Sequence, residues 1–151
     1  MIRDDINAAL KEAMKARHER RVSTLRLVNS TLKNADIEAR GQGREPLGDE
    51  AVLGVLQKMI KQRNESADLY DQGGRPELAQ QEREEIVVIS AYLPPQMSQD
   101  EVKAAIAEAI GATGAAGAKD MGKVIGALKG KYAGRMDFAK ASALVKAALS
   151  G

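Results

Sequence analysis

Two adjacent prolines, Pro94 and Pro95, constrain the fold of this chain more than any other feature. A proline has no backbone N–H to donate, and it disfavours helical geometry at the residue before it. A helix that reaches Leu93 therefore cannot continue through this point. The proline pair predicts a boundary in the chain, with one domain over residues 1–93 and a second over residues 94–151.

A new helix is predicted directly after the prolines. The sequence Ser-Gln-Asp-Glu that begins at Ser98 has the form of a capping box, in which the Ser98 and Glu101 side chains each accept from the other residue's backbone N–H. The segment between the two domains is short and carries apolar side chains, which favours a packed elbow over a flexible tether. We predict that the joint is made by Tyr92, Leu93, Pro94 and Pro95.

The composition favours an all-α fold. Hydrophobic residues make up 44% of the chain and charged residues 29%, but aromatic residues only 3%, so helices packed through aliphatic side chains are favoured over sheets. Cysteine is absent, which excludes disulfides and thiolate metal sites. There is no leader-like segment at the start and no apolar run of roughly 20 residues, so we expect a cytoplasmic protein without a membrane span.

Apolar spacing predicts four helices before the prolines. The first begins near Ile2, the second covers roughly residues 21–40, the third begins with Asp49 as its cap, and the fourth begins at Pro76. Residues 86–89 are four consecutive β-branched residues, so a short strand is the alternative there. We prefer a helix because no partner strand is visible and an isolated strand leaves its backbone groups unpaired.

Three shorter helices are predicted after the prolines, as a minimal bundle. The first of them has Val102 and Ile106 on its inner face, the second begins at Lys119 or Asp120, and the third is capped by Asp137. The inner face of the last helix is predicted to hold Phe138, Ala141, Leu144, Val145, Ala148 and Leu149.

The net charge of +2 conceals an uneven distribution. Up to Leu93 there are 15 basic and 16 acidic residues, whereas from Pro94 onward there are 8 basic and 5 acidic residues. The segment from Lys119 to Lys146 alone carries seven cations against two aspartates. A polyanion is therefore the natural partner for the second half of the chain.

Glycine recurs at every fourth position in this basic segment, at Gly122, Gly126, Gly130 and Gly134. At about 100° per residue the four glycines share one side of a helix and the apolar residues share the opposite side. Each glycine inside a helix costs roughly 1 kcal/mol relative to alanine, but a bare backbone between lysines lets a phosphate–sugar chain approach closely. The alternative is that Gly130 and Gly134 end the helix and Gly126 admits a neighbouring helix.

Catalytic and metal-binding patterns are missing from the sequence. No P-loop, nucleophile-elbow or zinc-protease motif occurs, and a single histidine, His18, does not make a metal site. We therefore expect no catalytic residue, no metal and no cofactor. A second basic cluster near the N-terminus is interpreted as a solvated helix face; it consists of Lys11, Lys15, Arg17, Arg20, Arg21 and Arg26.

Four blocks of the sequence carry a family resemblance. Residues 92–98 (Tyr-Leu-Pro-Pro-Gln-Met-Ser), 121–126 (Met-Gly-Lys-Val-Ile-Gly), 134–137 and 144–146 resemble the GatB/YqeY family, and the likeness extends from Ile2 to Leu149. The chain is similar to the free-standing YqeY-like proteins. These in turn are similar to the C-terminal helical and tail domains of the B subunit of the glutamyl-tRNA/aspartyl-tRNA amidotransferase.

The resemblance implies a four-helix domain joined by the Pro-Pro elbow to a three-helix tail. In the amidotransferase the tail engages the outer corner of the L-shaped tRNA, so residues 121–126 and Gly134-Arg135 are the positions implied to face RNA. The kinase and amide-transfer chemistry of that family lies in a separate catalytic domain that this chain lacks. An activity as a carbon–nitrogen ligase with glutamine as amido donor is therefore an inherited label.

Our leading hypothesis is a non-catalytic accessory protein that binds tRNA or another structured RNA and is linked to tRNA-dependent amidation. One alternative is an adaptor that docks on an amidotransferase or a synthetase, and another is an amidase or carbon–nitrogen ligase. The residues predicted to contact RNA are Lys119, Gly122, Lys123, Gly126, Lys129, Gly130, Lys131, Gly134 and Arg135.

Overall fold

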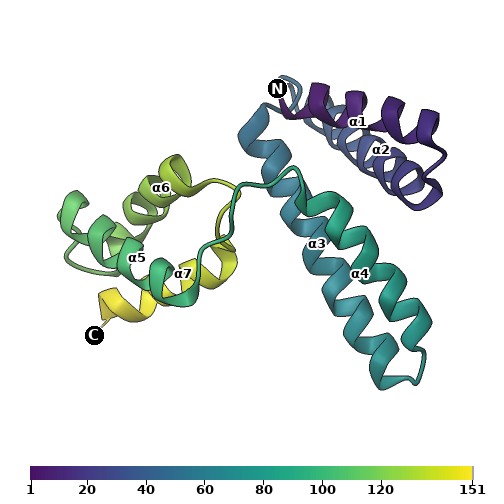
Figure 1. Cartoon of the computed structure of the whole chain (residues 1–151). Coiled ribbons are helices and arrows are strands. Elements are labelled where there is room, and N and C mark those ends of the chain that lie inside the picture. The colour runs from purple at the N-terminus through teal and green to yellow at the C-terminus, as the bar shows by residue number, and fades with distance from the viewer. Residues whose placement is uncertain (151) are drawn as a thin grey trace. The chain divides into compact units, whose positions relative to one another are not determined.

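The fold is all-α, as predicted, and Figure 1 shows it as a computed structural model that describes residues 1–150. Within these residues there are seven α-helices and one 3-10 turn, and no strand. The chain divides into two compact units, Met1–Leu93 and Pro94–Gly151. We call them the N-terminal unit and the tail unit.

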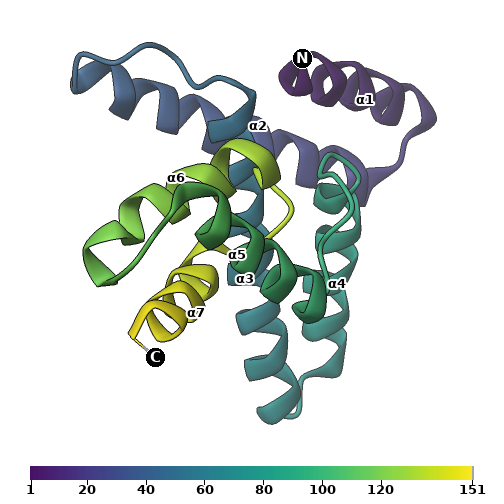
Figure 2. The same ribbon diagram turned by 90° about the vertical axis from the view of Figure 1, so that its left-hand side faces the viewer.

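The N-terminal unit consists of two helical hairpins (Figures 1 and 2). In the first, α1 packs along α2, and in the second, α3 packs along α4 after a turn at Gly73 and Gly74. The helices are α1 (Ile2–Ala16), α2 (Glu19–Gly41), α3 (Asp49–Gln72) and α4 (Pro76–Ser90).

Aliphatic side chains from all four helices form the core of this unit. Its fully buried members include Leu25 and Val28 of α2, which occupy the apolar seam expected from their spacing. The buried cluster is Ile6, Ala13, Leu25, Val28, Leu32, Val52, Leu56, Met59 and Ile89.

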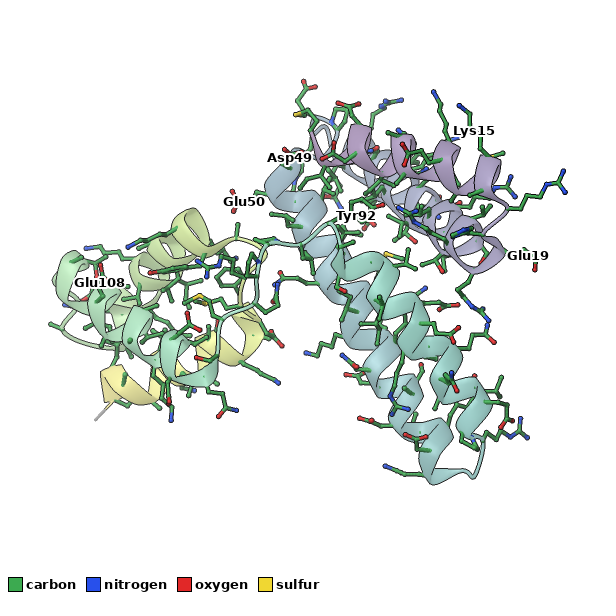
Figure 3. All side chains as sticks on the ribbon, viewed as in Figure 1. Lys15, Glu19, Asp49, Glu50, Tyr92 and Glu108 are labelled. Carbon is green, nitrogen blue, oxygen red and sulfur yellow. The ribbon has the colours of Figure 1, made fainter. Side chains whose placement is uncertain are left out.

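Two local details of this unit bear on the sequence predictions. The predicted capping role of Asp49 is wrong, because Gly48 occupies the cap position and Asp49 is already helical. The Asp49 Oδ1 atom instead accepts a hydrogen bond from the backbone N–H of Ile2, 3.3 Å away at the start of α1 (Figure 3). Residues 86–89 are helical, as preferred over the strand alternative, with Ile89 buried and Val87 70% exposed.

The tail unit is a bundle of three helices in which α6 packs against both of the others. Its elements are α5 (Gln99–Thr113), the 3-10 turn Ala118–Asp120, α6 (Met121–Tyr132) and α7 (Phe138–Ser150). The core cluster is Ala105, Ile106, Val124, Leu128, Met136, Ala141 and Val145. Leu144 and Ala148, predicted to face inward, are instead exposed.

Side-chain caps begin two of these helices, as predicted. At α5 the Ser98 hydroxyl accepts from the Glu101 N–H and the Glu101 Oε1 atom accepts from the Ser98 N–H, both at 3.1 Å. At α7 the Asp137 Oδ1 atom accepts from the Ala139 N–H at 2.9 Å. The same backbone hydrogen bond from Ser98, followed by the Ser98 hydroxyl, lowers the pKa of Glu101.

Removing the cap of α5 is expected to weaken the tail unit. Ser98→Ala should lower its free energy of unfolding by about 1 kcal/mol at neutral pH, measured by urea denaturation with hydrogen-exchange readout of residues in α5. Ser150→Ala, at an exposed position near the end of α7, is the matched control and should change little. Equal stability of Ser98→Ala and the wild type contradicts the assigned cap.

The capping box also makes a pH prediction. Because the pKa of Glu101 is lower in the folded state than its ordinary value of about 4.3, the ionised carboxylate stabilises the fold above that pH. This contribution is lost as the pH falls through the lowered pKa. The stability difference between the wild type and Glu101→Gln should therefore shrink between about pH 5 and pH 3, and a difference that grows in this range contradicts the assignment.

Candidate nucleic-acid interface

Three of the four predicted glycines lie on the solvent-exposed face of α6. A Cβ atom placed on Gly122, Gly126 or Gly130 would meet no atom of another element within 4 Å. On the opposite side of the helix, Val124 and Leu128 are 0% and 1% exposed. The alternative in which Gly126 admits a neighbouring helix is therefore wrong, and the bare backbone faces outward.

The fourth glycine does not belong to this exposed face. Helix α6 ends at Tyr132, and Gly134 is buried in the following turn with φ +77°. The left-handed region explains the glycine there, because side chains with a Cβ are disfavoured in it. The prediction that Gly134 faces a partner is wrong, since the wheel extends a regular helix beyond the point where the helix ends.

The segment around Gly134 binds the tail side of the joint through three hydrogen bonds. The Gly134 carbonyl accepts from Gln96 Nε2 at 2.6 Å, the Arg135 carbonyl accepts from the Met97 N–H at 2.9 Å, and Arg135 Nε donates to the Pro95 carbonyl at 3.0 Å. The Arg135 guanidinium carbon also lies 5.9 Å from the centre of the Tyr132 ring. These contacts give Arg135 a structural role in addition to its predicted one.

The other side of the joint belongs to the N-terminal unit. Tyr92 and Leu93 are partly buried against its core, and Figure 3 labels Tyr92 just beyond the end of α4. On the tail side, Met97 packs against the tail core. Each half of the joint is thus fixed to its own unit.

The four predicted lysines are exposed, but their surroundings differ. Lys129 Nζ lies 6.0 Å from the centre of the Phe138 ring on α7, whereas Lys131 Nζ lies 3.5 Å from Glu108 Oε1 on α5 (Figure 3). Lys123 keeps only a long contact of 3.9 Å to Asp120 and is 71% exposed. For Lys119, no ion pair occurs with any residue in the described range 1–150.

Electrostatics separate Lys131 from the other lysines. The adjacent Tyr132 side chain, and then the Glu108 carboxylate, raise the pKa of Lys131. The Lys131 ammonium group stays protonated and pairs with Glu108 of α5. The cations best placed to meet a polyanion are Lys119 and Lys123.

The result is a continuous exposed surface along α6. Lys129 lies near Phe138 of α7 and Lys131 near Glu108 of α5, and the backbone of the three glycines faces open space. We call this surface the glycine strip and define it as Gly122, Gly126 and Gly130 with the exposed cations Lys119 and Lys123. Chemically it offers ammonium groups beside a helix that a phosphate–sugar backbone can approach closely.

Other classes of site are not seen in the part of the chain that the structure describes. Across residues 1–150, no three His, Cys, Asp or Glu side chains come together as a metal site would require. No helix in that range has the length and apolarity needed to cross a membrane.

Sequence reasoning missed the role of Gln96, whose side-chain amide bonds two carbonyl groups, those of Pro94 and Gly134. The only available signal is its position directly after two prolines. It also missed a hollow between α1 and α2, which depends on the packing of the two helices and is described below.

Comparison with known proteins identifies the family. Residues 3–149, nearly the whole chain, match the family described as Yqey-like protein. The chain belongs to the YqeY-like family. The resemblance noted from the proline joint and the glycine block is thereby confirmed.

Curated relatives of this YqeY-like protein carry the name "Altered inheritance of mitochondria protein 41, mitochondrial". The one from Eremothecium gossypii is 35% identical over 97 residues, which are 63% of this chain and 51% of the relative. The one from Clavispora lusitaniae is 36% identical over 96 residues, or 62% and 54% of the two chains. The matched region thus spans about half the length of these relatives.

The names of these relatives correct one expectation. We expected a cytoplasmic protein because the sequence lacks cysteine and a leader-like segment, but the relatives are named as mitochondrial proteins. Neither sequence feature decides the compartment. A chain without cysteine is compatible with more than one compartment, so the inference was too broad.

Proposed function

We propose that this YqeY-like protein is a non-catalytic accessory module that binds tRNA, or another structured RNA, through the glycine strip, in connection with tRNA-dependent amidation. The observation that carries the proposal is the outward face of α6, where three glycines have open space above them. Such glycines cost on the order of 2 to 3 kcal/mol of helix stability in total, and no packing contact of their own unit offsets that cost. We assign these glycines the role of letting a partner approach the α6 backbone closely.

Charge and family membership support RNA as that partner. The strip carries Lys119 and Lys123 in a unit with more basic than acidic residues, which favours a polyanion. The chain belongs to the YqeY-like family over residues 3–149. Its resemblance to the tail domain of the amidotransferase B subunit, which engages tRNA, supports RNA as the partner in this proposal. Contacts to phosphate predict binding that weakens steeply with salt and has little sequence preference.

The site assignment is tested by blocking the strip and reversing one of its charges. Gly126→Leu with Lys123→Glu should weaken binding of unfractionated tRNA on the order of a hundredfold in an anisotropy titration, about 2.7 kcal/mol, because a bulky side chain covers the backbone and a phosphate contact becomes repulsive. The slope of log K against log salt should also become shallower by about one phosphate contact.

A matched control exists in the N-terminal unit. Gly54 lies in α3, is exposed and has open space around it, and Lys58 is an exposed cation one turn later. Gly54→Leu with Lys58→Glu makes the same chemical changes and should leave tRNA affinity within about twofold of the wild type. An affinity that is equal in both double variants defeats the assignment to the glycine strip.

A protein partner at the same strip is separated from RNA by a second measurement. If the strip binds RNA, proteins that co-purify with the wild-type chain through RNA should no longer be captured after the lysate is treated with RNase. Retention of a protein partner after RNase treatment, and its loss in the Gly126→Leu and Lys123→Glu variant, would favour the adaptor hypothesis instead.

A further inference from the structure

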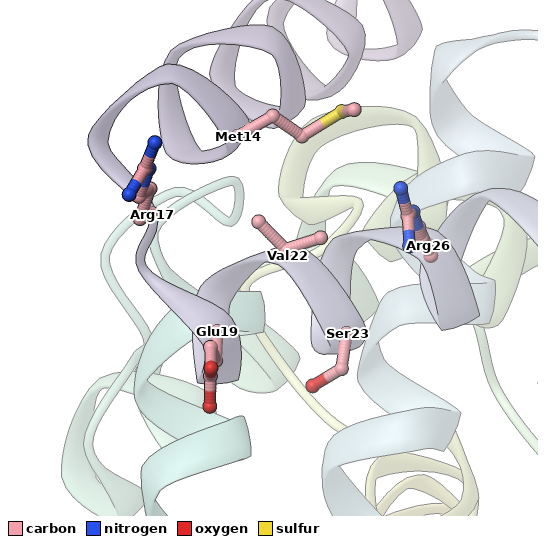
Figure 4. Close-up of a pocket in the computed structure, with 6 residues that line it drawn as sticks. All are labelled: Met14, Arg17, Glu19, Val22, Ser23 and Arg26. Atoms are coloured by element: carbon pink, nitrogen blue, oxygen red, sulfur yellow. The ribbon is translucent and has the colours of Figure 1, made fainter.

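The N-terminal unit has a hollow of about 410 Å³ where α1 ends and α2 begins (Figure 4). Met14 approaches from α1 and Val22 points toward it from α2, with Arg17 and Arg26 at the two ends of the hollow. The residues that line it are Met14, Arg17, Glu19, Val22, Ser23 and Arg26.

We propose that this hollow docks an acidic peptide segment of a partner protein, with an apolar side chain of the segment between two carboxylates. The apolar side chain contacts Met14 and Val22, and the carboxylates meet Arg17 and Arg26. This interaction is separate from the glycine strip and does not depend on it.

The floor of the hollow is apolar and accessible. Met14 is 49% exposed and, together with the half-buried Val22, supplies the apolar part of the lining. A methionine is flexible enough to adapt to differently shaped partner side chains. Glu19 and Ser23 line the edge of the hollow but direct their polar ends away from Met14 (Figure 4).

The two arginines are available for carboxylates. Within residues 1–150 neither Arg17 nor Arg26 has an acidic partner within 4.0 Å, whereas the nearby Arg20 lies 3.4 Å from Glu84 and 3.9 Å from Glu85. A guanidinium group binds a carboxylate with two parallel hydrogen bonds, so an unpaired arginine at each end matches a segment with two acidic side chains.

The backbone of Arg17 supplies an independent observation. Arg17 ends α1 in the left-handed region, with φ 58° and ψ 37°, and is the one non-glycine residue with positive φ in the described part of the chain. Glycine is the usual residue at such a helix end because it has no Cβ. The side chain of Arg17 is therefore carried on a backbone conformation that costs free energy for any residue with a Cβ, which supports a use for that side chain.

The chemistry of the hollow favours a peptide over RNA. A nucleic-acid backbone favours a row of cations, but between Arg17 and Arg26 the hollow is lined by Met14, Val22, Ser23 and Glu19, none of which is a cation. An apolar floor with a positive group at each end is the complement of an apolar side chain between acidic ones.

The test uses the full-length chain and a fluorescein-labelled peptide with a central leucine pair and two glutamates on each side. We expect saturable binding, weakened at least about tenfold when the leucines are replaced by serine or the glutamates by glutamine. No saturable binding of the leucine–glutamate peptide overturns the proposal. Tighter binding of a labelled single-stranded RNA, lost in the arginine variants, assigns the hollow to nucleic acid and also overturns it.

The variants are chosen so that loss of binding and loss of folding are separable. Arg17→Gly removes the cation but relieves the left-handed backbone, so the melting temperature should be unchanged or higher while peptide affinity falls about tenfold. Arg26→Gln should lower affinity similarly. Lys33→Gln, at an exposed cation farther along α2, makes the same charge change as Arg26→Gln and should bind the peptide like the wild type. Wild-type affinity in both arginine variants overturns the site.

Discussion

Leu128→Ala is expected to lower the free energy of unfolding of the tail unit by about 2 to 5 kcal/mol. Leu128 is 1% exposed and belongs to the tail core together with residues of α5 and α7. Truncating it removes apolar contacts and leaves a cavity that close-packed neighbours fill only in part. The tail is a unit of fewer than 60 residues, and small units of this kind have little stability to lose.

The same unit contains its own control for this substitution. Leu144 on α7 is 38% exposed, so Leu144→Ala changes the same side chain by the same atoms and should cost less than about 1 kcal/mol. Hydrogen exchange read by mass spectrometry distinguishes the two units. We expect faster exchange in α5, α6 and α7 of Leu128→Ala with α1 to α4 still protected. Equal effects of the two leucines, or simultaneous loss of protection in both units, contradict this expectation.

Replacing Gly122, Gly126 and Gly130 together by alanine is expected to stabilise the tail by about 2 to 3 kcal/mol, measured by urea denaturation. The three added methyl groups meet no other element within 4 Å, so no clash offsets the gain in helix propensity. Gly122 lies in the first turn of α6 and should contribute the least of the three.

The stabilised triple variant is also expected to bind tRNA less tightly than the wild type, because three methyl groups hold the phosphate backbone away from the helix. A trade of stability for function is common where a binding surface requires an unfavourable local sequence. Gly54→Ala in α3 provides the control, with a gain of up to about 1 kcal/mol and unchanged tRNA binding. If the triple variant is more stable but binds tRNA as tightly as the wild type, the proposed role of the three glycines is contradicted.

Features fixed by neighbouring residues could be predicted from the sequence. The capping box of α5 and the Asp137 cap of α7 are local patterns, and both form as predicted. The outward direction of Gly126 follows from helical periodicity, because Val124 and Leu128 on the same helix must be buried. Local order and periodicity therefore account for the helices and for the exposed face of α6.

Features that depend on packing between elements could not be predicted. Asp49 bonds the start of a different helix, and Gly134 is buried because it lies in a turn that the segment around Gln96 covers. Leu144 has the spacing of a core residue, but the bundle has no fourth helix to cover it. The hollow beside Met14 depends on the angle at which α1 packs against α2, and the spacing of residues along the sequence does not specify that angle.

The three hydrogen bonds that join residues 95–97 to Gly134 and Arg135 have a mechanical consequence. Residues 95–97 are hydrogen-bonded to the turn that directly follows α6. A displacement of the last residues of α6 therefore reaches these residues directly, without a change in α5 or α7. Occupancy of the glycine strip should therefore perturb the NMR signals of Gln96 and Met97, which serve as built-in reporters at a distance from the ligand.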